Sequence, residues 1–222
     1  AQERKPDEIS SRIALASQYL RQNESRKAVA VLNEAKVDQK QMPGYILLMS
    51  QGKLALGEHQ HAERLLEGLI VSNPGIPAAH FLLARSYSAD NKPEKMRSSL
   101  NKTMELEPNH FAANVIIARL DLFEGKIDAF KNRVAMLGEI FPENQQVQFF
   151  KAKIASGDSN FGGAIDTLSS LMEKTPNTEI IIDLSRNQWQ SGDKQAAISG
   201  LQLWVEVNND DSQAFMLLAQ FY

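Results

Sequence analysis

The chain has 222 residues, of which 43% are hydrophobic and 23% are charged, and this composition excludes a disordered chain. No apolar run reaches the roughly 18 residues of a membrane-spanning helix, so we expect no direct membrane insertion. The net charge of −3 gives no electrostatic reason to expect nucleic acid as a partner, and the absence of cysteine excludes disulfides, thiolate metal sites and thiol nucleophiles.

The chain opens with a polar leader, residues 1–8, in which Asp7 is a candidate helix cap. A regular spacing of prolines follows. Pro74, Pro108, Pro142 and Pro176 are evenly spaced, with a period of about 34 residues. A fixed period of this length is typical of helical repeat arrays, in which each unit is a pair of short helices that cannot bury its apolar face alone.

The repeats can be placed from the apolar pattern. In the best-formed unit, 77–110, Phe81 and Tyr87 mark a first helix and Leu100 marks a second, each within a set at helical spacing. We expect repeats at about 9–42, 43–76, 77–110, 111–144, 145–177 and 178–211, and a partial repeat at 212–222. Together they predict a single array over residues 1–222.

The turns inside the repeats are also periodic. Asn23, Gly57, Asn91 and Gly125 recur with the same period as the prolines, and Asn and Gly are the residues that accept a positive φ most readily at a helix end. The fifth repeat is expected to depart from this pattern. Its glycine-rich segment, residues 157–163, predicts a longer and more flexible turn.

Leu15, Ala16, Tyr19, Ala28 and Leu32, with the similar set that ends at Pro108, resemble the tetratricopeptide repeat. The resemblance covers nearly all of residues 9–222. It implies an all-α fold, a right-handed α-solenoid of antiparallel helix pairs. It also implies a scaffold that binds a protein partner.

A narrower resemblance rests on residues 192–222, which are similar to the repeat lipoproteins of the PEP-CTERM/exosortase system of Gram-negative bacteria. Those are envelope proteins associated with exopolysaccharide gene clusters, so the resemblance implies a periplasmic or envelope-attached protein. The chain departs from them in lacking a lipobox cysteine and in being much shorter. Because it begins at Ala1 and ends at Tyr222 inside a helical pattern, we expect a piece of a longer protein.

Two rows of side chains predict where a partner binds. The first helices of such repeats line the concave side, and they carry an apolar row and a basic row four residues later. The rows consist of Phe81, Val115, Phe149 and Ile182, and of Arg85, Arg119, Lys153 and Arg186, with Trp189 as a further anchor. This groove suits an extended or helical protein segment of acidic character.

Three alternatives remain open at this point. An anionic polysaccharide could bind the same groove. The four cations could instead be solvated or paired with nearby carboxylates, in which case they would contribute little. Trp189 could pack inside the fold.

The sequence predicts no enzyme, no metal site and no cofactor. His59 and His61 are two residues apart and point in different directions on a helix, and no third ligand is placed nearby. No nucleophile, base and acid form a recognisable set. The partial repeat lacks a second helix to cover Leu217 and Phe221, so we expect self-association through this end.

Overall fold

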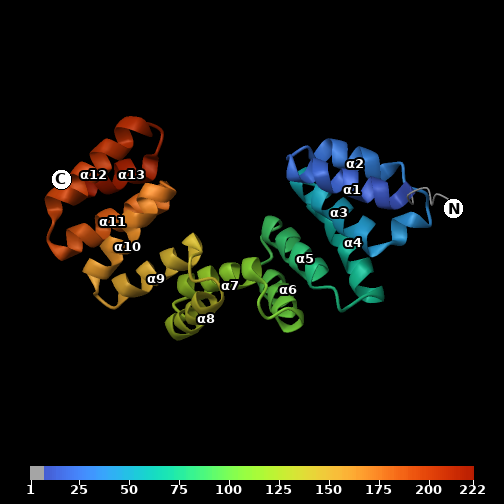
Figure 1. The fold of residues 1–222 in the computed structure, drawn as a ribbon, viewed down its shortest axis with the longest axis horizontal. Coiled ribbons are helices and arrows are strands. Elements are labelled where there is room, and N and C mark those ends of the chain that lie inside the picture. Colours follow the sequence, from blue (N-terminus) through green and yellow to red (C-terminus); the bar gives the residue numbers. More distant parts are fainter. Residues whose placement is uncertain (1–7) are drawn as a thin grey trace, which may run out of the picture. The chain divides into compact units, whose positions relative to one another are not determined.

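The computed structural model describes residues 8–222, and the predicted leader with its candidate cap Asp7 lies outside this range except for Glu8. The described part is all-α, with thirteen α-helices, one 3-10 helix at Gln39–Gln41 and no strand (Figure 1). None of its helices is long and apolar enough to cross a membrane.

The helices follow one another in pairs. They are α1 (Glu8–Arg21), α2 (Ser25–Asn33), α3 (Pro43–Ala55), α4 (His59–Ser72), α5 (Pro77–Ala89), α6 (Pro93–Leu106), α7 (Phe111–Phe123), α8 (Ile127–Ile140), α9 (Gln145–Gly157), α10 (Phe161–Lys174), α11 (Thr178–Ser191), α12 (Lys194–Val207) and α13 (Ser212–Phe221). Turns of two or three residues join the two helices of a pair, and such short connections make them antiparallel neighbours.

The chain divides into two compact units, and the division falls between Ile117 and Ala118 inside α7. In the first unit, α1 packs on α2, α3 on α4 and α5 on α6, and the pairs are joined by α2–α3 and α4–α5 contacts. In the second unit, α9 packs on α10 and α11 on α12, and α10–α11 and α12–α13 contacts join the repeats. The organisation as one array stays a prediction.

Fully buried aliphatic residues at one position of the second helices form the centre of each repeat. These residues are Leu32, Leu66, Leu100, Val134, Leu168 and Leu201, each at most 1% exposed. Burial of one such side chain contributes about 1.5–3 kcal/mol relative to leaving it in water. The recurrence explains why the same helix pair can form at each period of the sequence.

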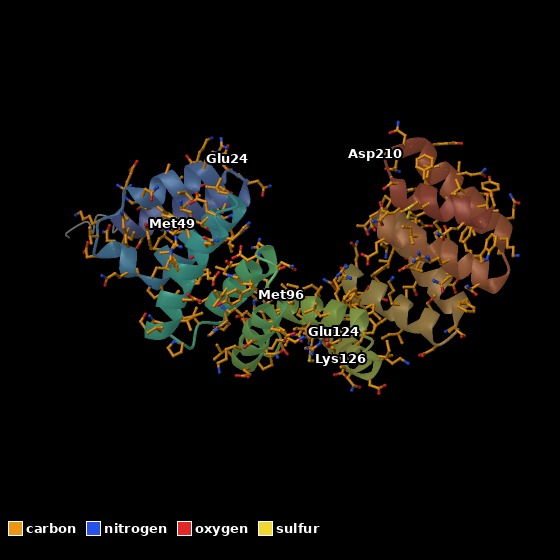
Figure 2. The ribbon with its side chains drawn as sticks, turned by 180° about the vertical axis from the view of Figure 1, so that it is seen from behind. Glu24, Met49, Met96, Glu124, Lys126 and Asp210 are labelled. Carbon is orange, nitrogen blue, oxygen red and sulfur yellow. The ribbon has the colours of Figure 1, made fainter. Side chains whose placement is uncertain are left out.

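The turns between paired helices share one backbone device. Asn23, Gly57, Asn91 and Gly125 have positive φ angles of 59°, 79°, 54° and 71°, so the prediction for these four residues is confirmed. In the α7–α8 turn, Glu124 and Lys126 flank Gly125 and form an ion pair (Figure 2).

The prediction of a longer turn in the fifth repeat is wrong. Three residues separate its two helices, as in the four earlier repeats, and its positive φ of 61° lies at Ser159, one full period after Gly125. Gly157 is the last residue of α9, while Gly162 and Gly163 lie in the first turn of α10. The glycines are therefore helical, and a serine occupies the left-handed position.

A second device recurs between repeats. The Nε2 atom of His80 lies 2.9 Å from the carbonyl oxygen of Pro74, and Asn114 donates from Nδ2 to the carbonyl of Pro108 at 2.8 Å. In the second unit, Gln148 donates in the same way to Pro142. Each donor lies six residues after its proline, so a side chain satisfies the carbonyl that the irregular linker leaves outside helical hydrogen bonding.

Candidate functional site

The predicted apolar row lies on first helices, but much of it is buried. Phe149 is 5% exposed and Ile182 is 9% exposed, while Phe81 and Val115 are half-buried. The ring of Phe81 packs against His110 with centroids 4.6 Å apart. These side chains mainly pack the repeats, and Phe149 offers almost no surface to a partner.

Two members of the predicted basic row are paired inside the second unit. Arg119 forms an ion pair with Glu179 of α11 at 3.2 Å, and its guanidinium also donates to the side chain of Gln146 at 3.0 Å. Lys153 of α9 forms an ion pair with Asp183 of α11. The pairing alternative is therefore realised at these two positions.

The other two members of the row differ from these. Arg85 in the first unit and Arg186 in the second are exposed. Within the described part of the chain, neither has an ion-pair or hydrogen-bond partner through its guanidinium. Each unit thus presents one guanidinium from this row to solvent.

Asp183 is a buried carboxylate, and its burial explains why it pairs with Lys153. It is 8% exposed, and it occupies the position that Leu82, Ile116 and Phe150 occupy in earlier repeats. A carboxylate in such a position requires a charge partner, because the cost of removing it from water is otherwise several kcal/mol. Lys153 is thus held by an interior group and is less available to a ligand.

Trp189 packs at the end of the second unit. Its indole stacks on the ring of Phe221 of α13, with centroids 4.2 Å apart and planes 11° apart. The ammonium of Lys194 lies 4.8 Å from the indole centre. Trp189 is half-buried, and Phe221 covers one of its faces.

One cavity coincides with the predicted site. It has a volume of about 410 Å³ and brings together the first helices α9, α11 and α13; we call it the α9–α11–α13 pocket. Its lining consists of Lys153, Glu179, Ile182, Asp183, Arg186, Gln213, Met216, Leu217 and Gln220. Three of these residues belong to the predicted rows.

The sequence prediction omits the α13 side of this pocket. Met216 and Gln220 lie one period after Ile182 and Arg186, so they continue the two rows into the partial repeat. The one-period spacing could have identified Met216 and Gln220 from the sequence. It is hard to see because Gln220 carries no charge and because α13 belongs to an incomplete repeat.

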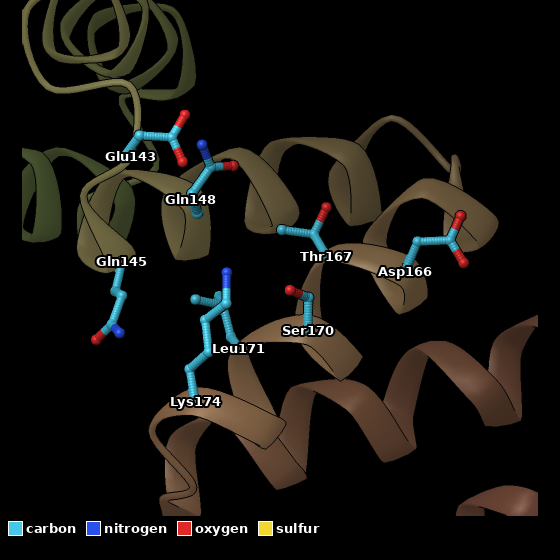
Figure 3. A pocket seen from close by; sticks show the side chains of 8 residues that line it. All are labelled: Glu143, Gln145, Gln148, Asp166, Thr167, Ser170, Leu171 and Lys174. Carbon is cyan, nitrogen blue, oxygen red and sulfur yellow. The ribbon is translucent and has the colours of Figure 1, made fainter.

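A second cavity of about 320 Å³ lies between α9 and α10 (Figure 3). Glu143, Asp166 and Lys174 are its charged groups, and it contains no aromatic ring. Gln148 and Thr167 in its lining already donate hydrogen bonds to the carbonyls of Pro142 and Gly163. In the described residues no group of three or more His, Asp or Glu side chains could hold a metal ion.

No protein-family model and no curated protein matches this chain. Among solved structures, a chain of the APC/C hetero-tetramer Cut9–Hcn1 is similar over 93% of this chain and 41% of its own length, with a TM-score of 0.74 and 15% identity. A tetratricopeptide repeat protein from Parabacteroides merdae is similar over 99% and 86%, with a TM-score of 0.63 and 14% identity.

PilF of Pseudomonas aeruginosa is similar over 83% of each chain, with a TM-score of 0.64 and 12% identity. In the Cut9–Hcn1 match, by contrast, this chain spans only about two fifths of the other chain's length. Similarity at this level of identity shows the fold. The predicted fold class, an all-α tetratricopeptide-type fold of antiparallel helix pairs, is confirmed.

Proposed function

We propose that this tetratricopeptide-type fold is a non-catalytic scaffold, whose first helices bind an extended or helical protein segment of acidic character. The observation that carries the proposal is Arg186, an exposed and unpaired guanidinium inside the α9–α11–α13 pocket. Arginine binds carboxylates through two parallel hydrogen bonds, which gives direction as well as charge. Arg85 offers the same group in the first unit.

Similar structures give this proposal general support. One of them, Cut9–Hcn1, is a hetero-tetramer, so a fold of this kind occurs in a complex with another chain. The resemblance of residues 192–222 to exosortase-system lipoproteins supports a role for the scaffold in the bacterial envelope, in exopolysaccharide assembly. That assignment rests on the resemblance alone.

An anionic polysaccharide is the alternative ligand for the same arginines. Trp189 is the candidate ring for stacking on a sugar, but Phe221 covers one of its faces. The α9–α11–α13 pocket contains no aromatic side chain. These two observations favour a polypeptide over a glycan. Sedimentation with a soluble polyuronate would test the glycan directly.

Self-association through α13 is part of the proposal. The residues expected to be uncovered are not: Leu217 is 4% exposed and Phe221 stacks on Trp189. Phe215 and Met216 of α13 and Tyr222 after it are 43%, 59% and 80% exposed instead, so this end still presents apolar surface. Apolar surface of this kind commonly marks an interaction site. Size-exclusion chromatography with light scattering over a range of concentrations tests it, and a monomer at the highest concentration would count against it.

Selection of random displayed peptides on the immobilised protein tests the scaffold proposal. We expect the selected peptides to be enriched in Asp and Glu, and their binding to be lost with Arg85→Glu combined with Arg186→Glu. Lys174→Glu on α10, the second helix of its pair, is the control for a single charge reversal away from the first helices. Peptides that bind the double variant as well as the wild type would contradict the proposal.

The choice of variants matters here. Arg119→Glu or Lys153→Glu would place a second carboxylate against Glu179 or Asp183. A loss of binding in these variants could then reflect damage to the fold. Arg85 and Arg186 avoid this problem because neither has a partner to lose within the described residues.

A further inference from the structure

The four charged residues that line the α9–α11–α13 pocket, Lys153, Glu179, Asp183 and Arg186, sum to zero, but Arg119 outside the lining brings a further cation to Glu179. Glu179 is paired with Arg119, and Asp183 is paired with Lys153, so both carboxylates of the lining are neutralised by cations of the row. Arg186 is exposed and lacks such a partner in the described part of the chain. With Arg119 counted, three cations face two carboxylates, and the charge of Arg186 is the one left without a paired carboxylate.

Neutral groups from α13 lie beside this charge. Gln213 and Gln220 line the pocket, and their side-chain amides make no hydrogen bond to any other described residue. Met216, 59% exposed, and Ile182 add apolar surface from α13 and α11. The pocket thus combines one free guanidinium, two free amides and an apolar wall.

This combination selects among ligand classes. A cationic ligand would have to displace Arg119 or Lys153 from the carboxylates, and Asp183 is nine-tenths buried in its pair. A doubly charged phosphate would find only one free cation. A single carboxylate meets the guanidinium bidentately, and the amides can donate to its oxygens or to a neighbouring peptide carbonyl.

We propose that the α9–α11–α13 pocket binds a carboxylate that lies next to an apolar side chain on a partner polypeptide. Arg186 binds the carboxylate, Gln213 and Gln220 orient it, and Ile182 and Met216 contact the apolar side chain. The inference rests on the proposed function, because it names the part of the partner that this surface holds. The carboxylate can come from an Asp or Glu side chain or from a chain terminus.

Titration of the 15N-labelled protein with four short acetylated peptides tests the pocket at millimolar concentrations. One carries an internal Leu-Glu pair and a C-terminal amide, the second has Leu-Gln, the third has Ala-Glu, and the fourth ends in Leu with a free carboxylate. We expect either the Leu-Glu peptide or the free-terminus peptide to bind about tenfold more tightly than the Leu-Gln peptide. The tighter of the two identifies the source of the carboxylate.

Variants assign the effect to named groups. Arg186→Gln should abolish the preference for the carboxylate, whereas Lys174→Gln should retain it. Met216→Ala should weaken binding of the Leu-Glu peptide toward that of the Ala-Glu peptide. The inference would be overturned if neither the Leu-Glu peptide nor the free-terminus peptide bound more tightly than the Leu-Gln peptide, if no peptide bound, or if the preference survived Arg186→Gln.

The display selection described for the proposed function, repeated with single variants, separates the failure of this inference from the failure of the proposed function. Display-selected peptides that still bind Arg186→Gln, but lose binding with Arg85→Glu, would overturn the pocket assignment alone. Failure to select any peptide would overturn the scaffold proposal as well. Thermal melts of each variant by circular dichroism establish that the fold is intact in every comparison.

Discussion

Trp189 and Phe221 stack face to face at 4.2 Å and join α11 to α13. Phe221→Ala removes this contact, and we expect it to lower the free energy of unfolding by about 1–3 kcal/mol, because the ring is half-buried and aromatic pairs add to area burial. Trp189 fluorescence should shift to longer wavelength as the indole gains water. Tyr222→Ala is the control, since its side chain is 80% exposed, and an equal loss in that variant would contradict the stacking account.

Ser159 occupies the left-handed position that Gly or Asn occupies in the five other turns between paired helices. We expect Ser159→Gly to raise the free energy of unfolding by about 0.5–1 kcal/mol, because glycine adopts this φ without steric cost. Ser156→Gly, inside α9, should have the opposite sign, since glycine is unfavourable in a helix. Urea denaturation measures both, and a destabilising Ser159→Gly would show that the turn is not strained.

The periodic turns show how far sequence reasoning reaches. Asn23 and Gly125 identify their turns because residue type and backbone requirement agree. The turn at Ser159 is harder to recognise from sequence. Three nearby glycines suggest a long loop, but all three belong to the flanking helices α9 and α10. Position within the period is the better guide, since the period reflects packing between repeats whereas a single glycine reflects only local freedom.

The site shows a different limit. The spacing of the cations predicts that they share a surface, and the pocket brings Lys153 and Arg186 together. The spacing does not reveal that Glu179 pairs with Arg119, which lies 60 residues away in the sequence. Such pairs depend on how helices of different repeats approach one another. Which cations remain free could therefore be established only from the structure.

Lys153 and Asp183 should be coupled in stability. Lys153→Met leaves a carboxylate that is 8% exposed without its partner, and we expect a loss of about 2–4 kcal/mol. Adding Asp183→Leu should recover most of this loss, because earlier repeats have Leu, Ile or Phe at the position. Chemical denaturation of the two single variants and the double variant measures the coupling. Additive losses would show that the pair does not act as a unit.

Asp211 should make stability depend on acid pH. Burial raises its pKa, but hydrogen bonds from Trp204 Nε1, Thr178 Oγ1 and the backbone of Ala214 outweigh this and hold the pKa below its ordinary value. A lowered pKa in the folded state contributes stability above the unfolded value of about 3.9, and that stability is lost as the pH falls through the folded value.

Asp211→Asn should therefore flatten the dependence of melting temperature on pH below about pH 4, and lower stability at neutral pH. Asp210→Asn is the matched control, because Asp210 is exposed and adjacent in sequence. Melting curves between acid and neutral pH measure both variants. An unchanged pH dependence in Asp211→Asn would show that the hydrogen bonds do not favour the charged form.

In the proposed function, the first helices hold an acidic segment through Arg186. Calorimetric titration with a display-selected peptide and its Glu→Arg counterpart, against wild type and Arg186→Glu, tests it most directly. We expect a charge swap: the acidic peptide binds wild type and loses at least about tenfold in affinity for Arg186→Glu, while the basic peptide gains affinity for that variant. If both peptides bind the two proteins equally, the claim is contradicted.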